Sequence, residues 1–245
     1  MKVGESVTGV HPPTSATIIT YDDGPTPGVT DALLAELAAA EARATFFVLL
    51  TRVRRNPGLL AEIIAAGHEV GLHGADHRRL TSLDPGELPS MLRDAKGELE
   101  DAAGLPVRWF RPPYGAQNAA SWQTTVDAGM TPVMWSIACR DWETLEPEAY
   151  LEPLRGRTLR GEVVLLHDGY ADACDGVDDG PAPELDRVAL TRGVLAEVAT
   201  QRLTVVTLSE AVAPGRPRLD VRLPAGERRF DRLRRLWRPT AGGPA

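Results

Sequence analysis

The sequence has few cysteines and no excess of positive charge, and each shortage excludes a class of protein. Its two cysteines, Cys139 and Cys174, are too few for a disulfide framework. We interpret both as free thiols, although a single long-range bridge stays open at this point. The formal charge of -7 at pH 7 disfavours nucleic acid or an anionic membrane as the partner of the whole chain, because both select basic surfaces. A neutral or cationic substrate fits this charge better.

Long apolar runs are also missing. Residues 1–14 are polar and lack the apolar stretch of a signal peptide, and no later stretch is long enough to cross a bilayer. We therefore expect a cytoplasmic protein with no transmembrane segment. A signal peptide that had already been removed would leave the same pattern.

The chain is long enough for one large domain with a buried core, since it has 245 residues, of which 43% are hydrophobic. Its basic residues gather at the end: residues 214–245 contain nine Arg and three acidic residues, a net charge of +6 that leaves -13 on the rest. We accordingly divide the chain into an N-terminal extension (1–14), a main domain (15–213) and an Arg-rich tail (214–245).

The tail also carries apolar residues at roughly helical spacing, namely Phe230, Leu233, Leu236 and Trp237. A short amphipathic helix usually buries its apolar face against its own protein, so we expect the tail to dock on the main domain. Contact with a partner protein, with a second copy of the chain or with a membrane surface are the alternatives.

Short β-branched runs alternate with helical patterns along the main domain, which is typical of βα units around a mainly parallel sheet. The runs that we interpret as strands are 16–20, 45–50, 69–72, 107–110, 132–137, 162–166 and 203–208. The segments with helical spacing are 30–42, 57–66, 85–103, 119–129 and 184–200. The pattern predicts an α/β fold, either an open doubly wound sheet or a closed barrel.

Side chains capable of chemistry follow five of the predicted strands. They are Asp22 and Asp23, His73 and His77, Arg111, Asp141, and His167. Because ligands bind at the carboxyl ends of the strands in both candidate folds, we expect these side chains to converge on one mouth. Residues 171–183, with four acids, form either a loop over that mouth or a merely solvated loop.

Asp22 and Asp23 stand side by side where a strand ends in a Gly-Pro turn. Adjacent strand residues point to opposite faces, so one acid can bind a cation while the other faces an attacking water. Capping of the turn is the plain alternative. His73 and His77, four apart on a helical turn, would face the same way and could hold one metal ion together with one of the acids. Such a site leaves positions open for water and substrate.

The remaining motifs could supply the other parts of a hydrolytic site. Arg111 precedes two prolines that hold its guanidinium in one pose, and it could pair with Asp141 from a neighbouring strand end or form only a structural salt bridge. Trp142 could form an apolar wall against an acyl methyl group, or it could pack in the core. His167 ends an apolar strand, as either a proton donor or a hydrogen-bonded core histidine. Asp22 and His167 are therefore the candidates for base and acid.

The order of these motifs resembles the polysaccharide deacetylase family, also called carbohydrate esterase family four. From about residue 16 to residue 213 the chain carries D-D-G-P, H-x-x-x-H, R-x-P-Y, D-W and L-x-H in the family's order. The resemblance implies a distorted (β/α)7 barrel and a metal-dependent deacetylase that acts on the C–N bond of an N-acetylated amino sugar, short oligosaccharide or related small molecule. The alternatives are an O-acetyl esterase on acetylated sugars and a non-catalytic metal- or sugar-binding module.

The resemblance also implies a role for each catalytic residue. The implied ligands of one divalent ion are Asp23, His73 and His77. We expect that ion to be Zn²⁺, with Co²⁺ or Ni²⁺ as alternatives. Asp22 would be the general base and His167 the general acid. Arg111 would position the base, and Asp141 would orient Arg111.

Three further residues are implied to contact the substrate. The backbone N–H of Tyr114 would bind the oxyanion, while Leu165 and Trp142 would line the acetate pocket. Two positions depart from the family pattern: Gly74 stands where Ser or Thr commonly steadies the loop, and Ala138 stands in place of an auxiliary Asp. Because aromatic residues make up only 5% of the chain, we expect a short sugar or a biosynthetic intermediate rather than a wall polymer.

Overall fold

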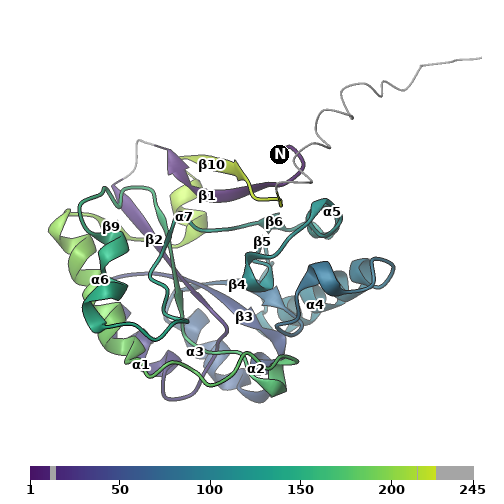
Figure 1. Ribbon diagram of the computed structural model, residues 1–245, viewed down its shortest axis with the longest axis horizontal. Helices are drawn as coiled ribbons and strands as arrows, with labels where there is room; N and C mark the ends of the chain where they lie inside the picture. Colours follow the sequence, from purple (N-terminus) through teal and green to yellow (C-terminus); the bar gives the residue numbers. More distant parts are fainter. Residues whose placement is uncertain (12–14, 214, 225–245) are drawn as a thin grey trace, which may run out of the picture.

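A curled parallel sheet forms the centre of the protein (Figure 1). The computed structural model describes residues 1–11, 15–213 and 215–224. Seven strands are hydrogen-bonded in the order β6-β5-β4-β3-β2-β8-β7, and β9 pairs with β2 off this path. The strands are β2 (Ala16–Asp22), β3 (Thr45–Leu49), β4 (Glu69–Gly74), β5 (Trp109–Phe110), β6 (Thr131–Pro132), β7 (Ile137–Ala138), β8 (Val163–His167) and β9 (Thr204–Val205). Each of these pairings is parallel, so the carboxyl ends of the strands share one side.

The sheet is a distorted barrel, as the family resemblance implies. Its path ends at β6 and β7, and within the part of the chain that the structure describes no ladder joins these two strands. The gap has a physical cause. Between β6 and β7 the chain crosses from β5 to β8: Val133 N donates to Phe110 O, Met134 N to Val7 O, and Ser136 N to Val163 O. The single strand predicted over 132–137 is therefore wrong.

Helices cover the outer face of the sheet (Figure 1). They are α1 (Thr30–Ala39), α2 (Leu50–Arg55), α3 (Pro57–Ala65), α4 (Leu88–Ala103), α5 (Ala119–Asp127), α6 (Arg187–Thr200) and α7 (Leu208–Val212). The five predicted helices are confirmed, with shifts of up to three residues at their ends. The short helices α2 and α7 were missed because each has only five or six residues, too few for helical spacing to show, and its first residue fell at the end of a predicted strand. A capping box between Thr207 and Glu210 begins α7.

Strand periodicity divides the core into two layers. On β2, Ile19 packs with the helices in the outer core, whereas Ile18 lies in the inner core of the barrel. The neighbouring strand β8 repeats the alternation, because Val164 pairs with Ile19 and Val163 with Ile18. Burial of such a side chain contributes about 1.5–3 kcal/mol relative to exposure, so both layers stabilise the frame that carries the site.

A second, two-stranded sheet closes the end of the barrel opposite the strands' carboxyl ends. Strands β1 (Glu5–His11) and β10 (Arg216–Val221) pair antiparallel, and Val7 and Val10 of β1 pack into the inner core. The start of the predicted tail is thus paired with the predicted N-terminal extension. The amphipathic stretch Phe230, Leu233, Leu236 and Trp237 lies outside the described residues.

Both cysteines are free, as predicted: Cys139 is buried and Cys174 is exposed. Among the helices in the described ranges, none combines the length and apolar character that crossing a membrane requires.

Candidate active site

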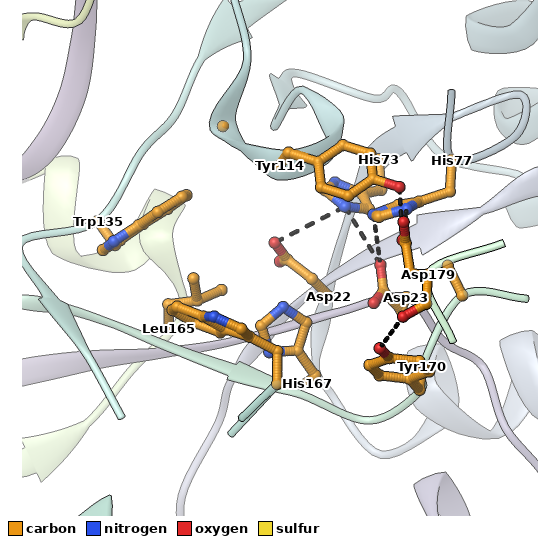
Figure 2. A pocket seen from close by; sticks show the side chains of 13 residues that line it. Asp22, Asp23, His73, His77, Tyr114, Trp135, Leu165, His167, Tyr170 and Asp179 are labelled. Carbon is orange, nitrogen blue, oxygen red and sulfur yellow. Dashed lines mark hydrogen bonds and ion pairs between the residues drawn. The ribbon is translucent and has the colours of Figure 1, made fainter. Parts of the chain in front are cut away.

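One cavity of about 270 Å³ opens at the carboxyl ends of the strands (Figure 2). Eight predicted site residues line it: Asp22, Asp23, His73, His77, Tyr114, Trp142, Leu165 and His167. The cavity is also lined by Ala171 and Asp179, from the predicted loop 171–183, and by three residues that the sequence analysis did not single out: Gly115, Trp135 and Tyr170. The convergence expected from the parallel strand ends is therefore observed.

Asp23, His73 and His77 form a buried cluster with metal-ligand chemistry. The Oδ1 atom of Asp23 lies 3.3 Å from Nε2 of His73 and 3.2 Å from Nε2 of His77. This oxygen is buried and has no hydrogen bond of proper geometry. Burial alone would raise the pKa of Asp23, but the adjacent His73 and the charge of His167 outweigh it and hold the pKa below its ordinary value. An ionised oxygen facing two imidazole nitrogens fits a divalent cation.

The two histidines do not stand on one helical turn, so that part of the prediction is wrong. His73 is on strand β4, and His77 lies in the loop that follows. Gly74 makes the turn between them: its φ is +149°, and a Cβ there would lie 2.5 Å from the carbonyl oxygen of Asp76. The Ser or Thr of the family pattern would not fit this backbone. His73 is oriented by its Nδ1 atom, which lies 2.8 Å from the carbonyl oxygen of Arg111.

Asp22 is held by Arg111, a fully buried side chain. Nη1 of Arg111 donates to Oδ1 of Asp22 at 2.7 Å and to Oγ1 of Thr20 at 2.8 Å, and Nη2 donates to the carbonyl oxygen of Met134 at 3.2 Å. The second oxygen of Asp22 lies 3.9 Å from Nε2 of His73, next to the cluster that the three candidate ligands form. One carboxylate oxygen is thus fixed, and the other is directed at the cavity.

Asp141 does not orient Arg111, and this correction follows from the strand order. Arg111 follows β5 and Asp141 follows β7, and these strands stand far apart in the sheet. Asp141 instead binds His167 of the neighbouring strand β8. Its carboxylate accepts from the backbone N–H of His167 at 2.7 Å, and its Oδ1 lies 2.7 Å from Nδ1 of the His167 ring. Arg187, at the start of α6, donates to Asp141 at 3.0 Å. Arg187 was missed because the sequence offered no signal for it.

The Asp141 carboxylate determines the charge of His167. Burial alone would lower the pKa of His167, but the charge of Asp141 and its hydrogen bond raise that pKa to about 9. The ring is therefore protonated at neutral pH. Because Nδ1 faces Asp141, the cavity-facing proton is the one on Nε2.

Aromatic and apolar side chains flank this polar centre. Leu165 is buried, and Trp142 is 37% exposed and meets His167 edge-on with ring centroids 5.5 Å apart. Trp135 adds a second indole to the same part of the cavity (Figure 2). Across from them lies Tyr114, whose ring centroid is 4.3 Å from that of His77 and whose φ is +60°. Trp135 was missed because it fell inside the predicted strand over 132–137.

Residues 171–183 cover the mouth rather than forming a merely solvated loop. The buried Asp175 anchors them to α2: it accepts from Thr51 Oγ1 at 2.6 Å, from Nε of Arg52 at 2.8 Å and from Nη2 of Arg55 at 2.7 Å. The loop then brings Asp179 to the cavity wall. No local pattern in the sequence pointed to this ion-pair network.

Comparison with known proteins agrees with this geometry. The family model "Polysaccharide deacetylase" matches residues 9–133. The chain is 34% identical over 194 residues to the peptidoglycan-N-acetylglucosamine deacetylase of Bacillus cereus, which covers 78% of this chain and 85% of that protein. It is 35% identical over 159 residues to a chitooligosaccharide deacetylase of Bradyrhizobium, covering 64% and 72%. Other curated relatives are longer, and the chain spans 34% to 36% of their length.

Among solved structures, the family 4 carbohydrate esterase from Streptomyces lividans, in complex with acetate, superposes with a TM-score of 0.67 at 26% identity. The superposition covers 78% of this chain and 92% of the esterase. The family model, the curated relatives and the shared fold lead to one conclusion: this chain belongs to the polysaccharide deacetylase family.

Proposed function

We propose that the chain hydrolyses the acetamide group of an N-acetylated amino sugar, free or in a short oligosaccharide, and releases acetate. One observation carries the proposal. An ionised, buried Asp23 faces two imidazole nitrogens in a cavity that also holds an Arg-paired aspartate and a protonated histidine. The relatives named as deacetylases of peptidoglycan N-acetylglucosamine and of chitooligosaccharides support this substrate class.

The three candidate ligands fit one divalent ion. Their donor atoms, two ring nitrogens and a carboxylate oxygen, all lie within 4.8 Å of one another. Mixed nitrogen and oxygen ligands suit Zn²⁺, with Co²⁺ or Ni²⁺ as alternatives. A bound divalent ion would supply a water of lowered pKa, near about 7 instead of about 15.7, and would polarise the acetamide carbonyl.

The protein's own groups would move the protons. Asp22, with one oxygen fixed on Arg111, takes a proton from the attacking water through its other oxygen. His167 then gives its Nε2 proton to the leaving nitrogen, while Asp141 stabilises the ring's charged form. Each such acid or base typically contributes about 10²- to 10⁴-fold in rate. The N–H of Tyr114 would donate to the developing oxyanion.

The apolar side of the cavity accounts for acetyl recognition. Leu165 and Trp142 stand beside His167, where the methyl group of the acetamide would lie. The cavity of about 270 Å³ is at the small end of ligand sites, which usually measure about 300–1,000 Å³. Its size favours one sugar residue over a long polymer segment. A cytoplasmic location, which would suit such a substrate, stays a prediction that fractionation of the source cells would test.

Acetate release from defined substrates tests the proposed function. Zinc-loaded protein should release acetate from N-acetylated glucosamine oligomers of one to four residues, and Asp22→Asn should reduce the rate about 10²-fold or more. Asp84→Asn, at an exposed carboxylate that does not line the cavity, is the matched control. Release from acetylated xylan alone would instead establish an O-acetyl esterase. Tight binding of acetylated sugars without any release of acetate would establish a non-catalytic module.

A further inference from the structure

His77 is the candidate ligand whose ring lacks a second partner. A histidine that binds a metal through Nε2 carries its other proton on Nδ1, and such rings are almost always held by an acceptor there. For His73 that acceptor is the carbonyl oxygen of Arg111. For His77, Nδ1 is buried and has no hydrogen-bond partner among the described residues.

The loop over the mouth already contacts this histidine at its backbone. The N–H of His77 donates to the carbonyl oxygen of Asp175 at 2.8 Å. Asp175 is in turn fixed by Arg52, which also donates to the carbonyl oxygen of Tyr170 at 2.8 Å. A buried ion pair thus sets the position of the loop relative to His77.

Only one of the loop's four carboxylates is available to the ring. Asp172 and Asp175 are paired with Arg52, and Asp178 is not among the residues that line the cavity. Asp179 lines the cavity, and its Oδ2 atom lies 3.9 Å from Nδ1 of His77. Figure 2 shows this carboxylate beside the His77 ring.

We propose that Asp179 is a positioning residue for the metal site: it accepts the Nδ1 proton of His77 and so orients the ring's Nε2 toward the ion. The inference rests on the metal site of the proposed function. At 3.9 Å the two atoms are about 1 Å beyond hydrogen-bond distance, a gap that a small movement of the exposed Asp179 side chain closes.

The Asp179 carboxylate also connects His77 to Tyr114, whose backbone N–H is the proposed donor to the oxyanion. The hydroxyl of Tyr114 donates to Oδ2 of Asp179 at 2.5 Å. An ionised carboxylate offers about four lone-pair sites, so it can accept from both the phenol and the imidazole. Asp179 would therefore hold Tyr114 and His77 in fixed positions relative to each other on one wall of the cavity.

Zinc affinity of the metal-free protein, measured by competition with a chromophoric chelator, tests the inference without relying on activity. Asp179→Ala should raise the dissociation constant for Zn²⁺ about 10- to 100-fold, the usual effect of losing such a partner. Asp179→Asn should raise it less, because the amide oxygen can still accept. Asp178→Ala is the matched control from the same loop and should leave it unchanged. Tyr114→Phe, which removes the other hydrogen bond to Asp179, should also leave zinc affinity unchanged.

Two results would overturn the inference. One is an unchanged zinc affinity in both Asp179 variants. The other is an equal weakening of zinc binding by Tyr114→Phe, because Asp179 would then act only through the tyrosine. Thermal unfolding of the metal-free variants shows whether they are folded as the wild type is. A wild-type protein that binds zinc but releases no acetate would contradict the proposed function and leave the role of Asp179 standing, whereas a wild type that binds no zinc contradicts both.

Discussion

Asp141 is bonded to His167 at two points, at the backbone N and at the ring Nδ1, each at 2.7 Å. This double contact fixes both the orientation and the charge of the ring. Because Arg187 and the strand order of β7 and β8 hold Asp141 in place, the pair is built into the frame of the barrel.

The first prediction concerns the pH dependence that this pair creates. A general acid must be protonated, so activity should be present below the pKa of His167, about 9, and lost as the pH rises through it. Asp141→Asn removes the charge that raises this pKa. The alkaline limb of the profile of kcat/KM against pH should therefore move toward 6.5. An unmoved alkaline limb in this variant would assign that limb to a different group.

Arg111→Lys should impair catalysis without removing the positive charge. A lysine ammonium cannot reproduce the planar fork that reaches Asp22, Thr20 and the Met134 carbonyl together. We expect kcat to fall by at least about 10-fold, because a misplaced Asp22 would lose part of its contribution as general base. Arg108→Lys, at an exposed arginine three residues earlier, is the control. Urea unfolding of both variants separates a catalytic loss from a loss of fold.

Metal binding should stabilise the protein through His77. An ion that binds only the folded state adds about 2.7 kcal/mol to the free energy of unfolding at 100 times its Kd. Addition of Zn²⁺ to chelator-treated protein should thus raise Tm. His77→Ala should abolish this increase, and His11→Ala, at an exposed histidine on β1, should retain it. A zinc-dependent increase that survives in His77→Ala would place the ion at another site.

Gly74→Ala tests whether the turn after β4 requires glycine. Its φ of +149° and the 2.5 Å approach of the Asp76 carbonyl predict a loss of about 1–3 kcal/mol in the free energy of unfolding. In contrast, Gly97 lies within helix α4, where a Cβ meets no atom within 4 Å. Gly97→Ala should stabilise the protein by about 0.5–1 kcal/mol. Chemical denaturation of the two variants side by side distinguishes these effects, and equal stabilities would contradict both.

Local features of the sequence predicted much of the site. The strands that carry Asp22, His73 and His167 at or next to their ends were recognised because a buried strand leaves an apolar run bounded by turn residues. Side chains at the ends of such runs reach the same side of a parallel sheet. The pairing of Arg111 with Asp141 was predicted wrongly for the opposite reason, whereas its pairing with Asp22, which the family resemblance implied, agrees with the structure. Whether it meets Asp141 or Asp22 depends on the order of strands in the sheet, which alternation along the chain does not contain.

The amino-acid sequence alone determined the βα alternation, the family and the residues that reach the mouth of the cavity, because each depends on short-range spacing and on the order of the motifs. Only the tertiary structure decided what those residues touch. The Asp141–His167 pair, the Arg52–Asp175 anchor, the approach of Asp179 to His77 and the pairing of β1 with β10 all join segments distant in sequence. Such contacts arise from strand order and packing, and no local pattern of residues specifies them.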